Sequence, residues 1–209
     1  AAAICYGFGK NTDNLNIIFF DFGGGTLDVS LLNINNGVYE VIGSCGNNNL
    51  GGSDFDLKIM EYCLDKFIEN NNLPKDNFIK KISNNNIHKL KMLSEQAKIS
   101  LSDNNNTKIK IEKFYEDIDL FIEINRDTFN EIINNLLLLI IKPINDLLEL
   151  CDIEKNNINE IIMVGGMTKM PIIRYNIEKF FNSNVNYSIN PDNVVSIGAA
   201  IHGFMINNK

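Results

Sequence analysis

Residues 17–32 read IIFFDFGGGTLDVSLL, and this stretch decides the fold. Residues 17–22 form a short apolar run, which is typical of a strand buried on both faces. From 26 to 32, polar and apolar residues alternate with the period of a strand. Because only the glycines at 23–25 join the two runs, the pattern predicts a tight hairpin. A third run at 38–43 follows the turn NINNG and extends the hairpin to a three-stranded antiparallel meander.

Beyond the meander, helical and strand patterns alternate along the chain. Pro143 should kink the longest helix, and Asn190-Pro191-Asp192 should open the last one. Asparagine runs at 47–49, 70–72, 84–86 and 104–106 are expected to mark loops. The other predicted elements are a helix from about residue 53, a helix at 87–101, strands at 107–114 and 118–124, a helix at 129–148, a strand at 160–164 and a helix at 171–181. This order predicts an α/β fold with a mixed sheet and an inserted, smaller α+β part.

The composition excludes several classes of protein. The chain has 209 residues and a net charge of −7, so no basic stripe is available for nucleic acid. The longest apolar run, 136–141, is far shorter than the ~20 residues of a membrane span. The N-terminal residues AAAICYGFGK lack the basic start of a signal peptide.

The cysteines and histidines show no metal-ligand spacing. Cysteines stand at 5, 45, 63 and 151, and histidines at 88 and 202. Gaps this wide predict reduced thiols rather than a metal or disulfide framework. An intracellular, reducing compartment is therefore expected, either the cytoplasm or a mitochondrion-like organelle.

The glycine hairpin is the first candidate site. Glycines Gly23, Gly24 and Gly25 would let backbone N–H groups approach phosphate oxygens, and they permit positive φ. Asp21 at the strand end could hold a Mg²⁺-bound water, with Thr26 beside it. The alternative is a glycine-rich turn that binds no ligand.

Three further motifs carry candidate binding residues. The sequences LGGSDFD at 50–56 and IIMVGGMTKMP at 161–171 place glycine pairs just before helices, where a ligand could lie against the backbone. In SEQAKISLS at 94–102, Glu95, Lys98 and Ser102 share one helix face and could grip a ribose. The alternative for the two glycine pairs is a tight turn that binds no ligand, and the alternative for the helix is a solvated face with one Glu–Lys pair.

In order and spacing, these four motifs and SINPDNVVSIGAAIHG at 188–203 resemble the 70-kDa heat-shock chaperones over essentially the whole chain. VGGMTKMP and SIGAAIHG look more like the bacterial and organellar branch. The resemblance implies lobe II of an actin-like (ribonuclease H-like) ATPase domain. Residues 1–56 and 125–209 would form its sheet-bearing subdomain, and 57–124 the smaller subdomain on the adenine side.

The resemblance also implies ATP or ADP with Mg²⁺ as ligands, bound jointly with a lobe I outside these residues. Asp21 would order the Mg²⁺ waters and the attacking water. The residues implied for phosphate contact are Gly23, Gly24, Gly25 and Thr26, with Gly52 flanking the nucleotide; those implied for ribose and adenine are Glu95, Lys98, Ser102, Gly166, Lys169 and Asp192.

Some positions depart from the family pattern. Ser53 stands where an acid is usual, and Met167 replaces a common serine. Ile99 and Lys169 occupy positions where arginines stack on adenine in the family. The loss of guanidinium stacking predicts weaker adenine binding, by about 1–2 kcal/mol.

As a family member, the parent protein would be an ATP-driven switch with a separate peptide-binding domain, J-domain proteins and nucleotide exchange factors as partners, and no membrane role. Two alternatives stay open. One is a sugar kinase of the same superfamily. The other is a degenerate, non-catalytic relative that binds partners.

Overall fold

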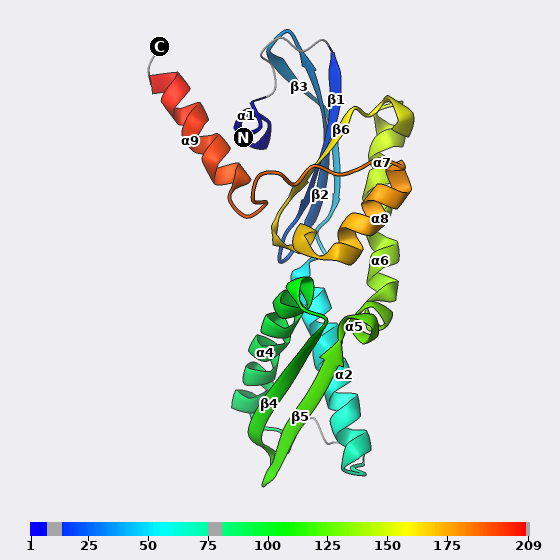
Figure 1. Cartoon of the computed structure of the whole chain (residues 1–209), viewed down its shortest axis with the longest axis vertical. Coiled ribbons are helices and arrows are strands. Elements are labelled where there is room, and N and C mark those ends of the chain that lie inside the picture. The colour runs from blue at the N-terminus through cyan, green and yellow to red at the C-terminus, as the bar shows by residue number, and fades with distance from the viewer. Residues whose placement is uncertain (8–13, 75–80, 208–209) are drawn as a thin grey trace. The chain divides into compact units, whose positions relative to one another are not determined.

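The computed structural model describes residues 1–7, 14–74 and 81–207. Its elements, labelled in Figure 1, fall into two compact units. The first unit comprises Ala1–Gly52 and Leu137–Lys209, and the second comprises Ser53–Leu136. The assignment of such units to two subdomains of an ATPase lobe stays a prediction.

The first unit is built on a four-stranded mixed sheet. Strands β1 (Leu15–Phe22), β2 (Leu27–Asn35) and β3 (Val38–Asn47) form an antiparallel meander, as predicted. Strand β6 (Glu160–Val164) lies parallel to β1, which gives the order β3-β2-β1-β6. β1 is central and Ile17 to Phe20 are buried, because both faces of the sheet are covered.

Helices cover the two faces of this sheet. On one face, Ile17, Phe19 and Val164 form a core cluster with residues of the short helix α1 (Ala2–Cys5) and of α9 (Val194–Asn207). On the other, α7 (Lys142–Leu150) packs against β2 and β3 (Figure 1). The sheet is thereby a rigid base that fixes the hairpin between β1 and β2.

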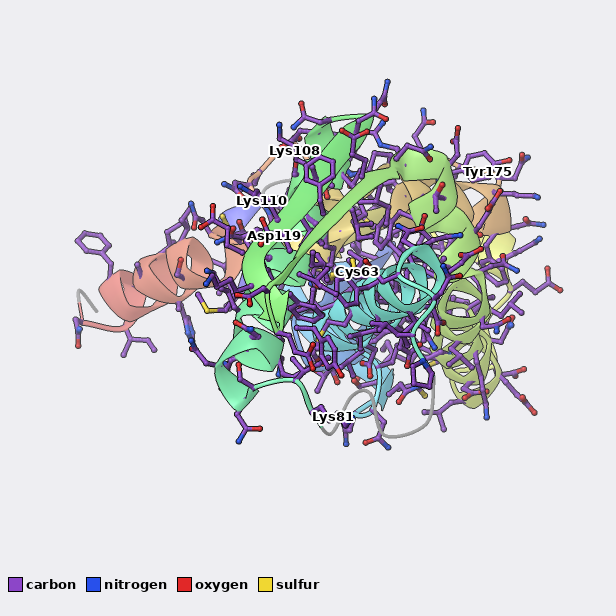
Figure 2. All side chains as sticks on the ribbon, turned by 90° about the horizontal axis from the view of Figure 1, so that it is seen from below. Cys63, Lys81, Lys108, Lys110, Asp119 and Tyr175 are labelled. Carbon is purple, nitrogen blue, oxygen red and sulfur yellow. The ribbon has the colours of Figure 1, made fainter. Side chains whose placement is uncertain are left out.

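The second unit combines two helices with a hairpin. Helices α2 (Gly52–Asn70) and α4 (Asn84–Asp103) are followed by strands β4 (Asn106–Tyr115) and β5 (Ile118–Asn125), as predicted. The alternating residues of the hairpin divide between a buried and an exposed side. Lys108, Lys110 and Asp119 belong to the exposed set (Figure 2).

The helix predicted at 129–148 is interrupted twice. The chain forms α5 (Arg126–Ile132), α6 (Asn134–Ile140) and α7. Pro143 lies in the first turn of α7, so it begins a new helix and does not kink a continuous one. Proline is favoured there because the first helical N–H groups have no partner within the helix.

Two helix starts also differ from the prediction. The asparagine run at 84–86 is the first turn of α4, not a loop. Ser83 caps this helix, because its hydroxyl accepts a hydrogen bond from the Asn86 N–H. The side-chain amide of Asn86 donates to the carbonyls of Lys113 and Phe114. At the other helix, Asn190 Oδ1 accepts from the Asp192 N–H at 3.1 Å, and α9 begins at Val194. Side-chain hydrogen bonds shift both boundaries.

Other elements of the described residues are two short 3₁₀ turns, η1 (Lys155–Asn157) and η2 (Gly166–Lys169), and the helix α8 (Pro171–Phe181). The helix α8 has the bounds that the sequence predicts. Across the described ranges, no helix combines the length and apolar character needed to cross a bilayer.

Cys63 should be far less reactive than the other thiols. All four cysteines are free, and Cys63 is fully buried within the second unit (Figure 2). Burial raises the pKa of its thiol to about 12, so its thiolate is on the order of a thousand times scarcer than that of an ordinary cysteine. We expect iodoacetamide to modify half-buried Cys45 and Cys151 in the native protein and Cys63 only in urea, as peptide mass spectrometry would show. Native modification of Cys63 at the rate of Cys45 would contradict this packing.

Candidate functional site

The loop between β1 and β2 presents an exposed, glycine-rich tip. The Gly23 N–H donates to the Thr26 carbonyl at 3.0 Å, which closes the turn. The Thr26 hydroxyl donates to Asp28 Oδ2 at 3.0 Å, so the threonine is fixed at the base of the tip. Gly24, Gly25 and Thr26 are all exposed. The tip thus offers backbone groups and one hydroxyl to an incoming ligand.

The fold itself does not need glycine at this tip. A Cβ atom on Gly24 or Gly25 would meet no atom within 4 Å, and one on Gly23 would meet only the Thr26 carbonyl, at 3.9 Å. None of the three adopts a positive φ, which corrects the expectation that they permit such a conformation here. Without a side chain, Gly24 and Gly25 would allow a ligand to approach the backbone closely.

A second glycine pair supports the tip from behind. A Cβ atom on Gly51 would lie 2.4 Å from the Cα of Gly25, so only glycine fits there. The buried Gly52 donates its N–H to the Gly23 carbonyl at 3.0 Å. The observed role of Gly52 is therefore to hold the tip, and its predicted place beside a nucleotide stays a prediction.

Two aspartates stand side by side below the tip. Asp21 of β1 and Asp28 of β2 are directly opposite in the antiparallel register. Burial and, to a lesser degree, the Asp28 carboxylate raise the pKa of Asp21. Like charges in such a pair repel, and a divalent cation nearby would relieve the repulsion. Asp21 and Asp28 therefore fit a hydrated Mg²⁺, which would neutralise phosphate charge.

The turn after β6 completes one side of the site. Gly165 has φ +83°, and a Cβ atom on it would lie 2.4 Å from the Phe22 carbonyl oxygen and 2.8 Å from Asp21 Oδ1. Its N–H donates to the Pro191 carbonyl at 3.1 Å. A Cβ atom on Gly166 would lie 3.1 Å from Asp192 Oδ1, and the other oxygen of Asp192 forms an ion pair with Lys169.

These contacts bring together the predicted site residues of the first unit. Each neighbours the next through an observed contact, from the hairpin tip to the start of α9. The cluster, called the glycine ridge below, consists of Asp21, Gly23, Gly24, Gly25, Thr26, Asp28, Gly51, Gly52, Gly165, Gly166, Lys169 and Asp192. It is continuous in space although its members come from four separate stretches of the chain.

The predicted residues of the second unit are arranged differently from the open face that their spacing indicates. Glu95 is exposed, but Lys98 is buried and forms an ion pair with Asp56. The Ser102 hydroxyl points back to the Lys98 carbonyl, at 3.4 Å. Ile99 is 58% exposed on the same helix. Convergence of this helix and the glycine ridge on one nucleotide stays a prediction.

The predicted site residues do not include four residues that shape these sites. Gly51 and Gly165 are the first members of the two glycine pairs, and only the close backbone approach explains them. Asp28 could have been found by counting across the hairpin from Asp21. Asp56 carries no local signal, because its partner lies more than forty residues further along the chain.

Comparison with known proteins identifies the family. The model of the Hsp70 protein family matches residues 1–208. The chain belongs to the Hsp70 family. It is 36% identical over 212 aligned residues to heat shock cognate 70 kDa protein 3 of Dictyostelium discoideum, and 37% identical over 209 to the heat shock 70 kDa protein of Penicillium citrinum.

These alignments cover 99% of this chain but only 32% and 40% of the two relatives, respectively. The Hsp70 chain described here therefore spans about a third to two fifths of their length. Its mixed α/β architecture agrees with the actin-like ATPase fold of the family, as the resemblance predicted. The names of the relatives do not distinguish the bacterial and organellar branch, which stays a prediction.

Proposed function

We propose that this chain is lobe II of an Hsp70 nucleotide-binding domain and binds ATP or ADP jointly with a lobe I that lies outside the 209 residues. The observation that carries the proposal is the hairpin tip, where the exposed Gly24 and Gly25 have open space around them that a side chain could fill. An Asp pair suited to Mg²⁺ lies directly below that tip. Phosphate and divalent cation are the ligands that this combination favours.

In this proposal, different residues of the glycine ridge bind different parts of the nucleotide. The backbone of Gly24 and Gly25 and the Thr26 hydroxyl contact the terminal phosphates. Asp21 accepts a hydrogen bond from the attacking water and from waters around the metal, while Asp28 holds Thr26 in place. Gly166 and Asp192 line the ribose side, with Asp192 Oδ1 close to the Gly166 backbone.

The adenine side should bind weakly. Lys169 forms an ion pair with Asp192, and both side chains are about half exposed, at 41% and 47%. A nucleotide has to share or displace this pair, and lysine cannot stack on the base as a planar guanidinium does. Glu95, Lys98 and Ser102 of the second unit are proposed to complete the adenosine site.

In the complete protein, nucleotide exchange and hydrolysis would drive the binding and release of peptides by a separate domain. J-domain proteins and nucleotide exchange factors would be the partners that control this cycle. The four free thiols suit a reducing compartment. These statements about the whole protein extend the proposal beyond the chain itself.

The test is to fill the tip without disturbing the fold. Gly24→Val, in the complete protein with lobe I, is expected to weaken ADP binding at least tenfold, because the added side chain occupies the path of the phosphates. Isothermal titration calorimetry measures the affinity, and the melting temperature should stay within about 2 °C. Gly203→Ala in α9, where the added methyl also has open space, is the matched control and should bind ADP normally.

Unchanged ADP affinity in Gly24→Val would remove the tip from the nucleotide site. A wild-type protein that binds no nucleotide would favour the non-catalytic relative. ATP turnover that depends on an added sugar would favour the sugar kinase.

A further inference from the structure

One ion pair in the second unit is buried. Lys98 Nζ lies 2.8 Å from Asp56 Oδ1, and the two side chains are only 10% and 8% exposed. On the same helix as Asp56, the pair Lys58–Glu61 is far more open, at 37% and 60%. The Asp56–Lys98 pair is thus set apart from ordinary surface ion pairs by its burial.

Such a pair is not needed to stabilise a fold. The loss of hydration on burial can exceed the attraction between the charges, and apolar residues of similar volume would serve stability as well. Burial indeed raises the pKa of Asp56, although hydrogen bonding and attraction from Lys98 act in the opposite direction. A specific use for a fixed ammonium group would explain why these positions carry charges.

The geometry indicates what Asp56 does to Lys98. A lysine side chain has four rotatable bonds, and a single carboxylate at 2.8 Å removes most of that freedom. Lys98 lies one turn after the fully buried Ser94 on the same helix, so its stem is also packed. The charges of Lys98, Glu95 and Lys91 all act on the pKa of Asp56, so its carboxylate lies against this stretch of α4.

We propose that Asp56 is a positioning residue that holds the Lys98 ammonium in the orientation required to bind the ribose of the nucleotide. The inference rests on the proposed function, in which Lys98 takes part in the adenosine site. Asp56 does not touch the nucleotide. It acts by restricting Lys98, in the way that a supporting residue fixes a ligand-binding group.

The experiment uses Asp56→Asn in the complete protein with lobe I. Asparagine keeps the shape of the side chain but removes the charge that fixes Lys98. We expect ADP to bind about tenfold more weakly, because the ion pair at 2.8 Å no longer orders the ammonium. The specific readout is the ratio between the dissociation constants of 2′,3′-dideoxy-ADP and ADP, which should fall several-fold toward one in the variant.

Three further variants separate positioning from folding. Asp56→Glu, which retains the carboxylate, should restore part of the ADP affinity. Glu61→Gln removes an acid from an exposed pair of the same helix and should leave both affinities unchanged. In a Lys98→Met background, Asp56→Asn should have little further effect on the ratio, because the group that it positions is gone.

The outcomes are distinct. A wild-type protein that binds no ADP would overturn the proposed function and this inference with it. Normal ADP binding with an unchanged ratio in a folded Asp56→Asn variant would overturn the inference alone. Tighter ADP binding in that variant would also overturn it, because Asp56 would then compete with the nucleotide for Lys98.

Discussion

Asp21→Asn in the complete protein is expected to slow ATP hydrolysis about a hundredfold, which is a typical loss for a residue that orients the attacking water. The carboxylate lies at the end of β1, beside Asp28 and against the Gly165 turn. Asparagine is almost the same size but cannot accept a proton or hold Mg²⁺ waters in the same way. A steady-state assay of phosphate release measures the effect, and ADP affinity should fall much less.

The same substitution should make the folded protein more stable near neutral pH. The pKa of Asp21 is raised in the folded state, so the charged carboxylate opposes folding at pH values above the pKa of the unfolded chain. Asparagine removes that cost. The advantage of Asp21→Asn should disappear as the pH falls below about 4, where the wild-type residue is protonated in both states.

Two controls accompany the predicted loss of ATP hydrolysis in Asp21→Asn. In the proposed function, lobe I lies outside the 209-residue chain, so the turnover of this chain by itself should equal that of its own Asp21→Ala variant. Glu61→Gln, far along α2 from the glycine ridge in sequence, should leave the rate of the complete protein unchanged. Turnover in Asp21→Asn within threefold of the wild type would show that Asp21 does not take part in the reaction.

Gly51→Ala is expected to lower the free energy of unfolding by about 3 kcal/mol, the upper range for forcing extra atoms into a packed site. The added methyl would lie within 2.4–2.5 Å of three backbone atoms of Gly25. Backbone cannot rotate away as a flexible side chain can, so β1, β2 or the start of α2 must move. Urea denaturation measures the loss as a lower midpoint at an unchanged slope.

Gly24→Ala is the matched control for this prediction. Its methyl group would meet no atom within 4 Å, so the free energy of unfolding should stay within about 0.5 kcal/mol of the wild type. Gly165→Ala should behave like Gly51→Ala, because it adds a methyl 2.4 Å from the Phe22 carbonyl at a positive φ. A loss below 1 kcal/mol for both Gly51→Ala and Gly165→Ala would mean that these turns adapt easily.

The elements that sequence predicts best are those with a strong local pattern. The meander and the hairpin at 106–125 follow from alternation, and α8 follows from a proline start and helical spacing. The sequence predicts one helix at 129–148 with a kink at Pro143, because its apolar spacing persists across the breaks at Ile133 and Ile141. Periodicity reports which residues are buried, and it does not report where the backbone hydrogen bonds are interrupted.

By itself, the sequence determined the strands of the meander and the glycine tip with Asp21. It also determined which residues belong to the motifs of the candidate site. These depend on residue type and on spacing within a single element. Only the tertiary structure decided which glycines the fold requires, since Gly51 and Gly165 are constrained by backbone atoms from other parts of the chain and Gly24 and Gly25 are not. It also decided that Lys98 is buried against Asp56, because an ion pair between two helices has no counterpart in local sequence.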